Sequence, residues 1–102
     1  VVRAGGIGEV VASQHPGFAV GDIVQGTFGW QEHWLGDGTT ETGPVTKLRA
    51  GVTPEQALGV FGVTGLTAWF GLTEIGKPTP GDTVLVSGAA GATGSVVVQV
   101  AK

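Results

Sequence analysis

The chain has 102 residues, which fits one small domain, and a formal net charge of −3. Its five basic residues are scattered, which argues against a nucleic-acid interface, and no apolar run reaches the roughly 18 residues of a membrane span. Cysteine is absent, which excludes disulfides and thiolate zinc sites; with no signal-peptide pattern, we expect a cytoplasmic protein. Twenty glycines and few charges indicate a turn-rich chain whose apolar faces need cover from partners.

Residues 1–48 predict short β-strands that are separated by turns. The expected strands cover residues 8–14, 23–28 and 30–35, of which the last either continues the second strand or begins another. Turns are indicated at residues 15–17, 21–22 and 36–38, where proline, glycine and aspartate cluster. Residues 39–46 read as a loop or an edge strand. This spacing predicts part of a small β-barrel.

Two helices are expected next along the chain. Thr53 fits an N-cap and Pro54 the first helical position, while Gly59 and Gly62 keep this helix short. The second helix is expected over residues 66–75, because apolar positions recur there at helical spacing on one face. Gly76 marks its end, and a Pro-Gly-Asp turn at residues 80–82 then leads into the last segment.

The last twenty residues read as a buried strand, a glycine-rich turn and the start of a helix. Residues 84–86 are an apolar Val-Leu-Val run, and Gly88, Gly91 and Gly94 follow in a G-x-x-G-x-x-G pattern. Without a Cβ, Gly91 lets the backbone approach a pyrophosphate, and Gly94 lets the helix pack tightly on the strand. The pattern predicts the first turn of a dinucleotide-binding fold; a tight strand-to-helix turn without a ligand is the alternative.

Several stretches resemble one enzyme superfamily in their order and spacing. They are Gly-Glu-Val-Val at residues 8–11, Val-Gly-Asp-Ile-Val at residues 20–24, Gly-Trp-Gln-Glu at residues 29–32, residues 62–71 and residues 87–95. The chain resembles the medium-chain dehydrogenase/reductase superfamily, and within it the zinc-independent, NADPH-dependent double-bond reductases. That group includes the leukotriene B4 12-hydroxydehydrogenase/prostaglandin reductases and the 2-alkenal reductases. The resemblance covers nearly the whole chain.

The resemblance implies a mixed α/β fold. Residues 1–48 would form part of a GroES-like β-barrel on the substrate side, residues 49–81 connecting helices, and residues 82–102 the first βα unit of a Rossmann domain that binds NADPH. It implies hydride transfer to the β-carbon of a small enone or enal, then protonation of the α-carbon, in a parent enzyme that is a homodimer. Reduction of a quinone by a member of the same superfamily is the alternative, although residues 29–32 and 62–71 favour the enone or enal.

The resemblance also implies which residues contact the cofactor. Gly91, Ala92 and Gly94 match the phosphate-loop positions, Thr67 matches a threonine beside the nicotinamide, and Val63 matches a neighbouring apolar position. Many members have Met-Pro where this chain has Val-Thr at residues 63–64, so Val63 is the weaker match. The residues alone leave a second interpretation for Thr67, in which it caps or back-bonds within its own helix.

Trp30 is the candidate for the wall of the substrate pocket. A place in the barrel core is the alternative, because a large aromatic side chain suits either environment. The other two tryptophans, Trp34 and Trp69, are expected to pack inside the protein.

No catalytic residue is identified. His15 fits a turn and His33 a half-exposed strand position, so no cluster of metal ligands is predicted. Ser87 and Ser95 lack the His/Asp partner pattern of a nucleophile. The family's proton-donor tyrosine has no match, because the chain contains no tyrosine.

The cofactor site is expected to be incomplete. The residue that selects NAD or NADP normally lies about twenty residues beyond the glycine turn, past Lys102. We therefore expect an internal segment of a longer reductase that is inactive alone; a non-catalytic module that kept the family sequence is the alternative. A single strand of a parallel sheet leaves unpaired edges, so we also expect the isolated chain to aggregate, to dimerise through strand exchange, or to be ordered only with partner segments.

Overall fold

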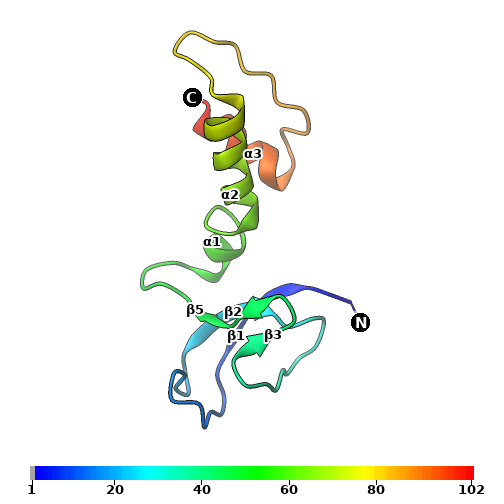
Figure 1. Cartoon of the computed structure of the whole chain (residues 1–102), viewed down its shortest axis with the longest axis vertical. Coiled ribbons are helices and arrows are strands. Elements are labelled where there is room, and N and C mark those ends of the chain that lie inside the picture. Colours follow the sequence, from blue (N-terminus) through cyan, green and yellow to red (C-terminus); the bar gives the residue numbers. More distant parts are fainter. Residues whose placement is uncertain (1) are drawn as a thin grey trace. The chain divides into compact units, whose positions relative to one another are not determined.

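The computed structural model describes residues 2–102. The chain divides into two compact units, and the boundary between them in the sequence lies between Pro54 and Glu55. The first unit contains the strands and the second contains the helices (Figure 1). Each unit is described by itself.

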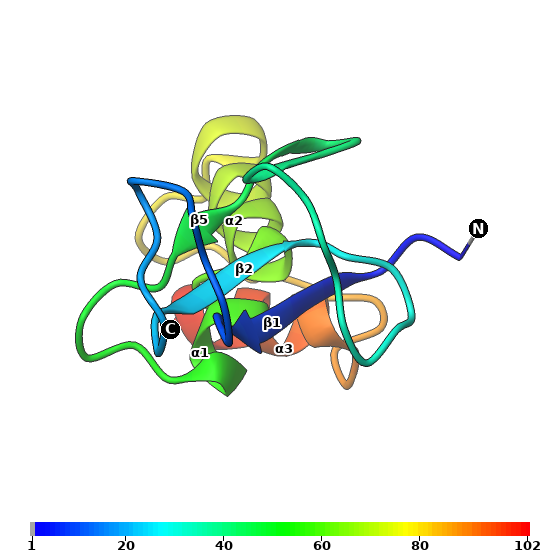
Figure 2. The ribbon, with the colours of Figure 1, turned by 90° about the horizontal axis from the view of Figure 1, so that it is seen from below.

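The first unit is built on a three-stranded antiparallel sheet (Figure 2). Strand β1 (Gly5–Glu9) pairs with β2 (Ile23–Thr27) in a register that places Gly5 opposite Thr27 and Glu9 opposite Ile23, and β5 (Thr46–Lys47) pairs with the other edge of β2. Strands β3 (Thr39–Thr40) and β4 (Gly43–Pro44) form a separate antiparallel pair. Val24 on the central strand and Val45 beside β5 are the buried apolar residues of this unit.

Two of the predicted strands differ from the structure. The strand expected at residues 8–14 begins at Gly5 and ends at Glu9, because Val10 bonds to the turn that precedes β2: its N–H donates to the Asp22 carbonyl and its carbonyl accepts from the Gly21 N–H. Residues 30–35 form no strand, whereas residues 39–46 contain the β3–β4 pair and the first residue of β5. The strand at residues 23–28 is confirmed, ending one residue earlier.

Two turns share one construction, a glycine followed by an aspartate that bonds back to the start of the turn. Asp22 N–H donates to the Ala19 carbonyl at 3.1 Å, and Asp22 Oδ2 accepts from the Ala19 N–H at 2.8 Å. Asp82 repeats both bonds with Thr79, at 3.0 Å and 2.7 Å. The glycines before them, at residues 21 and 81, have φ of +90° and +98°, which other residues rarely adopt. Both turns predicted from Gly-Asp are therefore confirmed.

The second unit contains α1 (Pro54–Leu58) from its second residue on, α2 (Val63–Phe70), a π-helical continuation η1 (Gly71–Gly76) and α3 (Ala92–Val100). Helix α1 begins at Pro54, as the sequence predicts. The connection to α2 is close-packed, because a Cβ at Gly65 would lie 1.7 Å from the Val60 carbonyl oxygen. Ala57 and Ala68 are the buried apolar residues of this unit.

The second predicted helix starts three residues earlier than expected and changes type. It runs from Val63 and becomes a π-helix at Gly71, where the Thr73 hydroxyl donates to the Trp69 carbonyl at 2.9 Å. It ends at Gly76, as predicted, and Lys77 closes it with φ of +47° while its N–H donates to the Leu72 carbonyl at 2.7 Å.

The predicted strand at residues 84–86 is not a β-strand in the structure. A strand needs a hydrogen-bonded neighbour, and within residues 2–102 no other segment pairs with this one. The strands of the first unit fit the predicted part of a β-barrel. The described residues do not form the sheet of a Rossmann domain.

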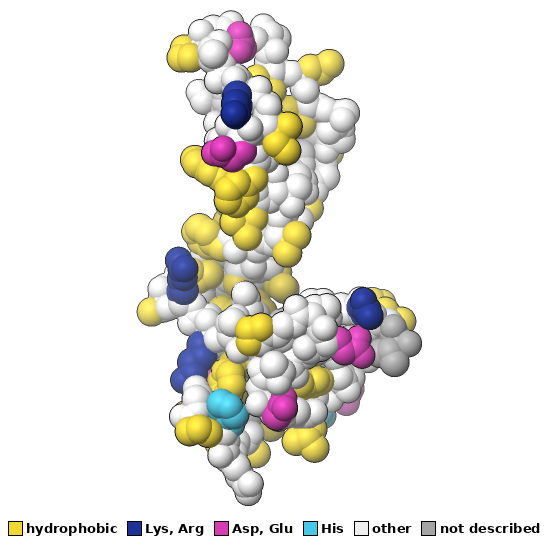
Figure 3. Space-filling model, viewed as in Figure 1, with side chains coloured by type: hydrophobic (Ala, Val, Ile, Leu, Met, Phe, Trp, Pro, Cys, Tyr) yellow, Lys and Arg dark blue, Asp and Glu magenta, His cyan; other side chains and the backbone are white. Residues whose placement is uncertain are grey.

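Many large apolar side chains remain on the surface, as the yellow patches of Figure 3 show for one face. Trp69, expected to pack, is 53% exposed, and Leu85 and Leu35 are almost fully exposed. None of the helices in the described part of the chain is long and apolar enough to cross a bilayer.

Candidate cofactor site

The glycine turn bends the chain sharply into α3. Gly88 has φ of +61°, and the Gly91 N–H donates to its carbonyl at 2.9 Å. Gly91 is the N-cap of α3, with extended backbone, and has no side chain to bond the first N–H groups of the helix. The first turn of α3 therefore presents backbone N–H groups without a side-chain cap, at the positive end of the helix dipole.

Gly94 is required by close contact with the turn. A Cβ there would lie 2.3 Å from the Gly88 carbonyl oxygen and 3.0 Å from Ala89 Cα, far inside contact distance. A Cβ at Gly91 would lie 3.2 Å from the same oxygen. The predicted tight packing at Gly94 is thus found, although its partner is the turn itself and not a strand at residues 84–86.

Thr67 and Val63 are joined directly on α2. The Thr67 hydroxyl donates to the Val63 carbonyl at 2.7 Å, so the back-bonding interpretation of Thr67 is correct as far as the hydroxyl proton is concerned. Both side chains are exposed, Val63 to 79%. The lone pairs of the Thr67 hydroxyl remain able to accept a hydrogen bond from a ligand.

A surface pocket of about 280 Å³ brings Thr67 close to the segment before the glycine turn. It is lined by Thr67, Ala68, Gly71, Leu72, Val84, Leu85, Val86, Ser87 and Val97. Ser87 is a pocket residue that the sequence interpretation missed, because it was weighed only as a nucleophile. The sequence feature that indicates a pocket role for Ser87 is its position at the end of the apolar run, because ligands of open α/β sheets bind at the ends of the strands.

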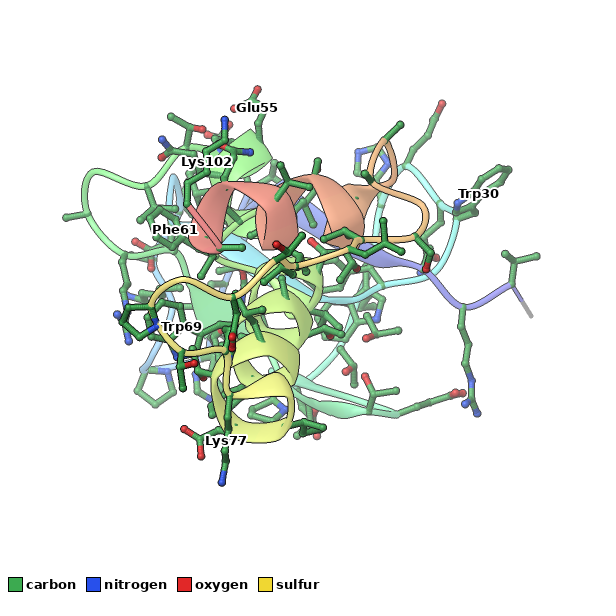
Figure 4. The ribbon with its side chains drawn as sticks, turned by 90° about the horizontal axis from the view of Figure 1, so that it is seen from above. Trp30, Glu55, Phe61, Trp69, Lys77 and Lys102 are labelled. Carbon is green, nitrogen blue, oxygen red and sulfur yellow. The ribbon has the colours of Figure 1, made fainter. Side chains whose placement is uncertain are left out.

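Trp30 lies in the first unit on a loop between β2 and β3. Its side chain is 85% exposed, so the alternative of a place in the core is wrong for the described structure. Figure 4 shows the indole pointing away from the ribbon. Gly29, with φ of +74°, turns the chain before it, and the neighbouring Phe28 and Trp34 rings pack together with centroids 5.2 Å apart.

The remaining candidate side chains have local structural roles. His15 Nδ1 accepts from the Gly17 N–H at 2.9 Å, which confirms its place in a turn. The Ser95 hydroxyl donates to the Ala92 carbonyl at 3.2 Å. Among residues 2–102, no group of three or more His, Cys, Asp or Glu side chains is placed to hold a metal ion.

Comparison with known proteins shows that this chain is similar to oxidoreductases. A family model described as the N-terminal domain of oxidoreductase matches residues 1–43. Prostaglandin reductase 1 of Oryctolagus cuniculus is 43% identical over 94% of this chain and 28% of its own length. The NADPH-dependent curcumin reductase of Escherichia coli strain K12 is 38% identical over 100% of this chain and 29% of its own.

A solved structure agrees with the sequence comparisons. The crystal structure of CurA from Vibrio vulnificus in complex with NADPH superposes with a TM-score of 0.81 and 39% identity, covering 96% of this chain and 28% of that one. The resemblance to the zinc-independent, NADPH-dependent double-bond reductases of the medium-chain superfamily is therefore confirmed. The chain spans less than a third of the length of these relatives.

Proposed function

We propose that this chain supplies substrate-side strands and the first nucleotide-binding turn of an NADPH-dependent oxidoreductase. The reaction is reduction of the carbon–carbon double bond of an α,β-unsaturated aldehyde or ketone. The observation that carries the proposal is similarity along 94–100% of the chain to reductases named for prostaglandin and for NADPH-dependent curcumin reduction. The Rossmann role of residues 82–102, the homodimeric parent enzyme and the cytoplasmic location are further parts of the proposal.

The start of α3 supports the binding of a dinucleotide. Ala92 and Gly94 offer backbone N–H groups, Gly91 adds no side chain that would block a ligand, and Gly94 fixes the turn against the helix. Uncapped N–H groups at a helix N-terminus favour phosphate. These residues fit a pyrophosphate, and bound NADPH would supply the hydride for the β-carbon.

Thr67 is proposed to orient the nicotinamide, with Val63 beside it. Because the Thr67 hydroxyl proton is held by the Val63 carbonyl, the hydroxyl acts toward a ligand as an acceptor. A carboxamide N–H is a suitable donor for it. The bond to Val63 also fixes the direction of the lone pairs, which helps to hold the ring in a reactive geometry.

Trp30 is proposed to line the substrate side. Its exposed indole offers a flat apolar surface that suits a conjugated enone or enal, and the packed Phe28–Trp34 pair supports the loop that carries it.

The test is a chimera in which these 102 residues replace the matching segment of the Escherichia coli reductase. Consumption of NADPH is measured with an enone and with a quinone. We expect faster turnover with the enone, and faster turnover with the quinone would contradict the substrate class. Within the chimera, Thr67→Ala should raise KM for NADPH about tenfold, the value of one hydrogen bond near 1.4 kcal/mol, whereas Thr67→Ser should not. Equal increases in KM for NADPH in Thr67→Ala and Thr67→Ser would contradict the proposal that the Thr67 hydroxyl accepts a hydrogen bond from the cofactor.

A further inference from the structure

The start of α2 has no side-chain cap. Its N-cap residue is Gly62, whose backbone is extended (φ −100°, ψ −162°) and which has no side chain to bond the first N–H groups of the helix. Helix α1 leads into this start through a short turn at residues 59–62 (Figure 1). The direction in which α2 begins therefore has to be fixed by other contacts with that turn.

Thr64 makes a side-chain bond between the turn and the first turn of α2. Its hydroxyl donates to the Gly59 carbonyl oxygen at 2.9 Å, and the Thr64 side chain is half-buried. The same oxygen accepts from the Gly62 N–H at 3.0 Å, so the residue after α1, the N-cap of α2 and the first turn of α2 meet at one carbonyl. Because this bond is partly shielded from water, it is stronger than an exposed one.

The first turn of α2 in turn holds the Thr67 hydroxyl. That hydroxyl donates to the carbonyl of Val63, the first residue of α2, at 2.7 Å. Because Val63 and Thr64 are adjacent, a shift of the Thr64 backbone moves the carbonyl that orients the Thr67 hydroxyl. Every donor and acceptor of these bonds lies within residues 59–67, so the arrangement does not require a strand or helix from elsewhere in a longer reductase.

We propose that Thr64 is a positioning residue for the cofactor, which acts through Thr67 and does not touch the cofactor itself. Its bond to the Gly59 carbonyl holds the first turn of α2, and thereby the lone pairs that the Thr67 hydroxyl presents to the nicotinamide carboxamide. Since hydrogen bonds weaken steeply with a change in angle, a small rotation of this turn is enough to weaken cofactor binding. The inference rests on the proposed role of Thr67 as an acceptor for NADPH.

Binding of NADPH to the chimera tests the proposal, because it is measured without a substrate. The dissociation constant is obtained from the fluorescence of the reduced nicotinamide for the unchanged chimera, Thr64→Val and Thr64→Ser. Valine keeps the β-branched shape but cannot donate a hydrogen bond, whereas serine keeps the hydroxyl. We expect Thr64→Val to raise Kd for NADPH about fivefold and Thr64→Ser to change it by less than about twofold.

A second variant guards against a folding defect. Thr64→Ala removes the same hydroxyl but introduces a better helix former, so it should raise Kd for NADPH as Thr64→Val does while the helix is intrinsically favoured. Circular dichroism of the chimera is compared for both variants. A Kd unchanged in either folded variant would overturn the proposal.

A double-mutant cycle separates positioning from general support of the helices. Thr67→Ala alone should raise Kd for NADPH about tenfold, and Thr64→Val should add no further increase beside it, because the group that it positions is gone. Independent effects would multiply to about fiftyfold. An increase of that size would overturn the proposal, since general support of the helices does not depend on the Thr67 hydroxyl.

Thr73→Val is the matched control. The Thr73 hydroxyl also donates to a carbonyl of its own helix, that of Trp69 at 2.9 Å, but it lies in η1, beyond Thr67 and away from the first turn of α2. We expect this variant to leave Kd for NADPH unchanged. An increase equal to that of Thr64→Val would show that loss of any threonine bond in this helix weakens binding, and would overturn the specific role of Thr64.

The outcomes also separate this proposal from the enzymatic one. If the unchanged chimera binds NADPH and Thr64→Val binds it equally well, only the positioning role fails. If the unchanged chimera binds no NADPH, the proposed function fails and this inference fails with it. Faster turnover with a quinone than with an enone would contradict the substrate class alone, because the Kd for NADPH is measured without either substrate.

Discussion

Gly94→Ala should destabilise the second unit although alanine is the better helix former. A Cβ at this position would lie 2.3 Å from the Gly88 carbonyl oxygen and 2.9 Å from its carbon. Because both are backbone atoms, the turn or the start of α3 has to move. Overpacking of this kind costs about 1–3 kcal/mol, and the gain in helix propensity from glycine to alanine returns about 1 kcal/mol. We expect a net loss of about 1 kcal/mol.

Gly71→Ala is the matched control for this substitution. Gly71 has helical dihedral angles, φ −59° and ψ −41°, and a Cβ there would meet no atom within 4 Å. The same chemical change should therefore stabilise the chain by about 0.5–1 kcal/mol. Urea unfolding followed by helical circular dichroism measures both variants. If Gly94→Ala is as stable as Gly71→Ala, the close contact with Gly88 does not exist in solution.

Two further predictions concern the ends of elements. Lys77 has φ of +47°, a conformation that costs a non-glycine residue about 1–2 kcal/mol, so Lys77→Gly should stabilise the chain by about 1 kcal/mol relative to Lys77→Ala, which keeps the strain but loses the charge. Equal urea midpoints for these variants would refute this account. Hydrogen bonds from Ala19 and then from Lys47 hold the pKa of Asp22 below its ordinary value, and hydrogen bonds from Thr79 do so for Asp82. Each lowered pKa contributes stability that is present above the ordinary aspartate pKa of 3.8 and is lost as the pH falls through the folded value. Asp22→Asn should therefore weaken the loss of stability below pH 3.8, and an unchanged acid profile would show that the turn does not hold the carboxylate.

Features with local causes could be predicted from the sequence. The Gly-Asp turns at residues 21–22 and 81–82 need only a glycine with positive φ and a carboxylate that bonds back three residues. The start of α1 at Pro54 and the end of η1 at Gly76 follow from the same kind of short-range chemistry.

Features that depend on distant partners could not be predicted. The end of β1 at Glu9 is set by its pairing with β2, and the β-propensity of residues 84–86 does not supply the neighbour that a strand needs. The exposure of Trp30 likewise depends on what surrounds its loop, and its sequence context suits both core and surface. The start of α2 at Val63 was missed for another reason. Gly62 was interpreted only as a residue that shortens the first helix, whereas it is the N-cap of α2, and Gly65 lies inside α2 where this helix passes the Val60 carbonyl.

Two glycines of the second unit are therefore needed for close packing in helices, whereas the number of glycines in the sequence indicated turns. Gly65 and Gly94 each lie in a helix at a point where a backbone carbonyl approaches within contact distance, from Val60 and Gly88 respectively. At both places the absence of a Cβ lets a turn pack directly on the helix that follows it, which fixes the direction in which that helix leaves the turn. For α3 this direction determines where the N–H groups of its first residues point. In the chimera, Gly94→Ala should thus raise KM for NADPH more than Gly71→Ala does, because only the former moves the N–H groups proposed to bind the pyrophosphate.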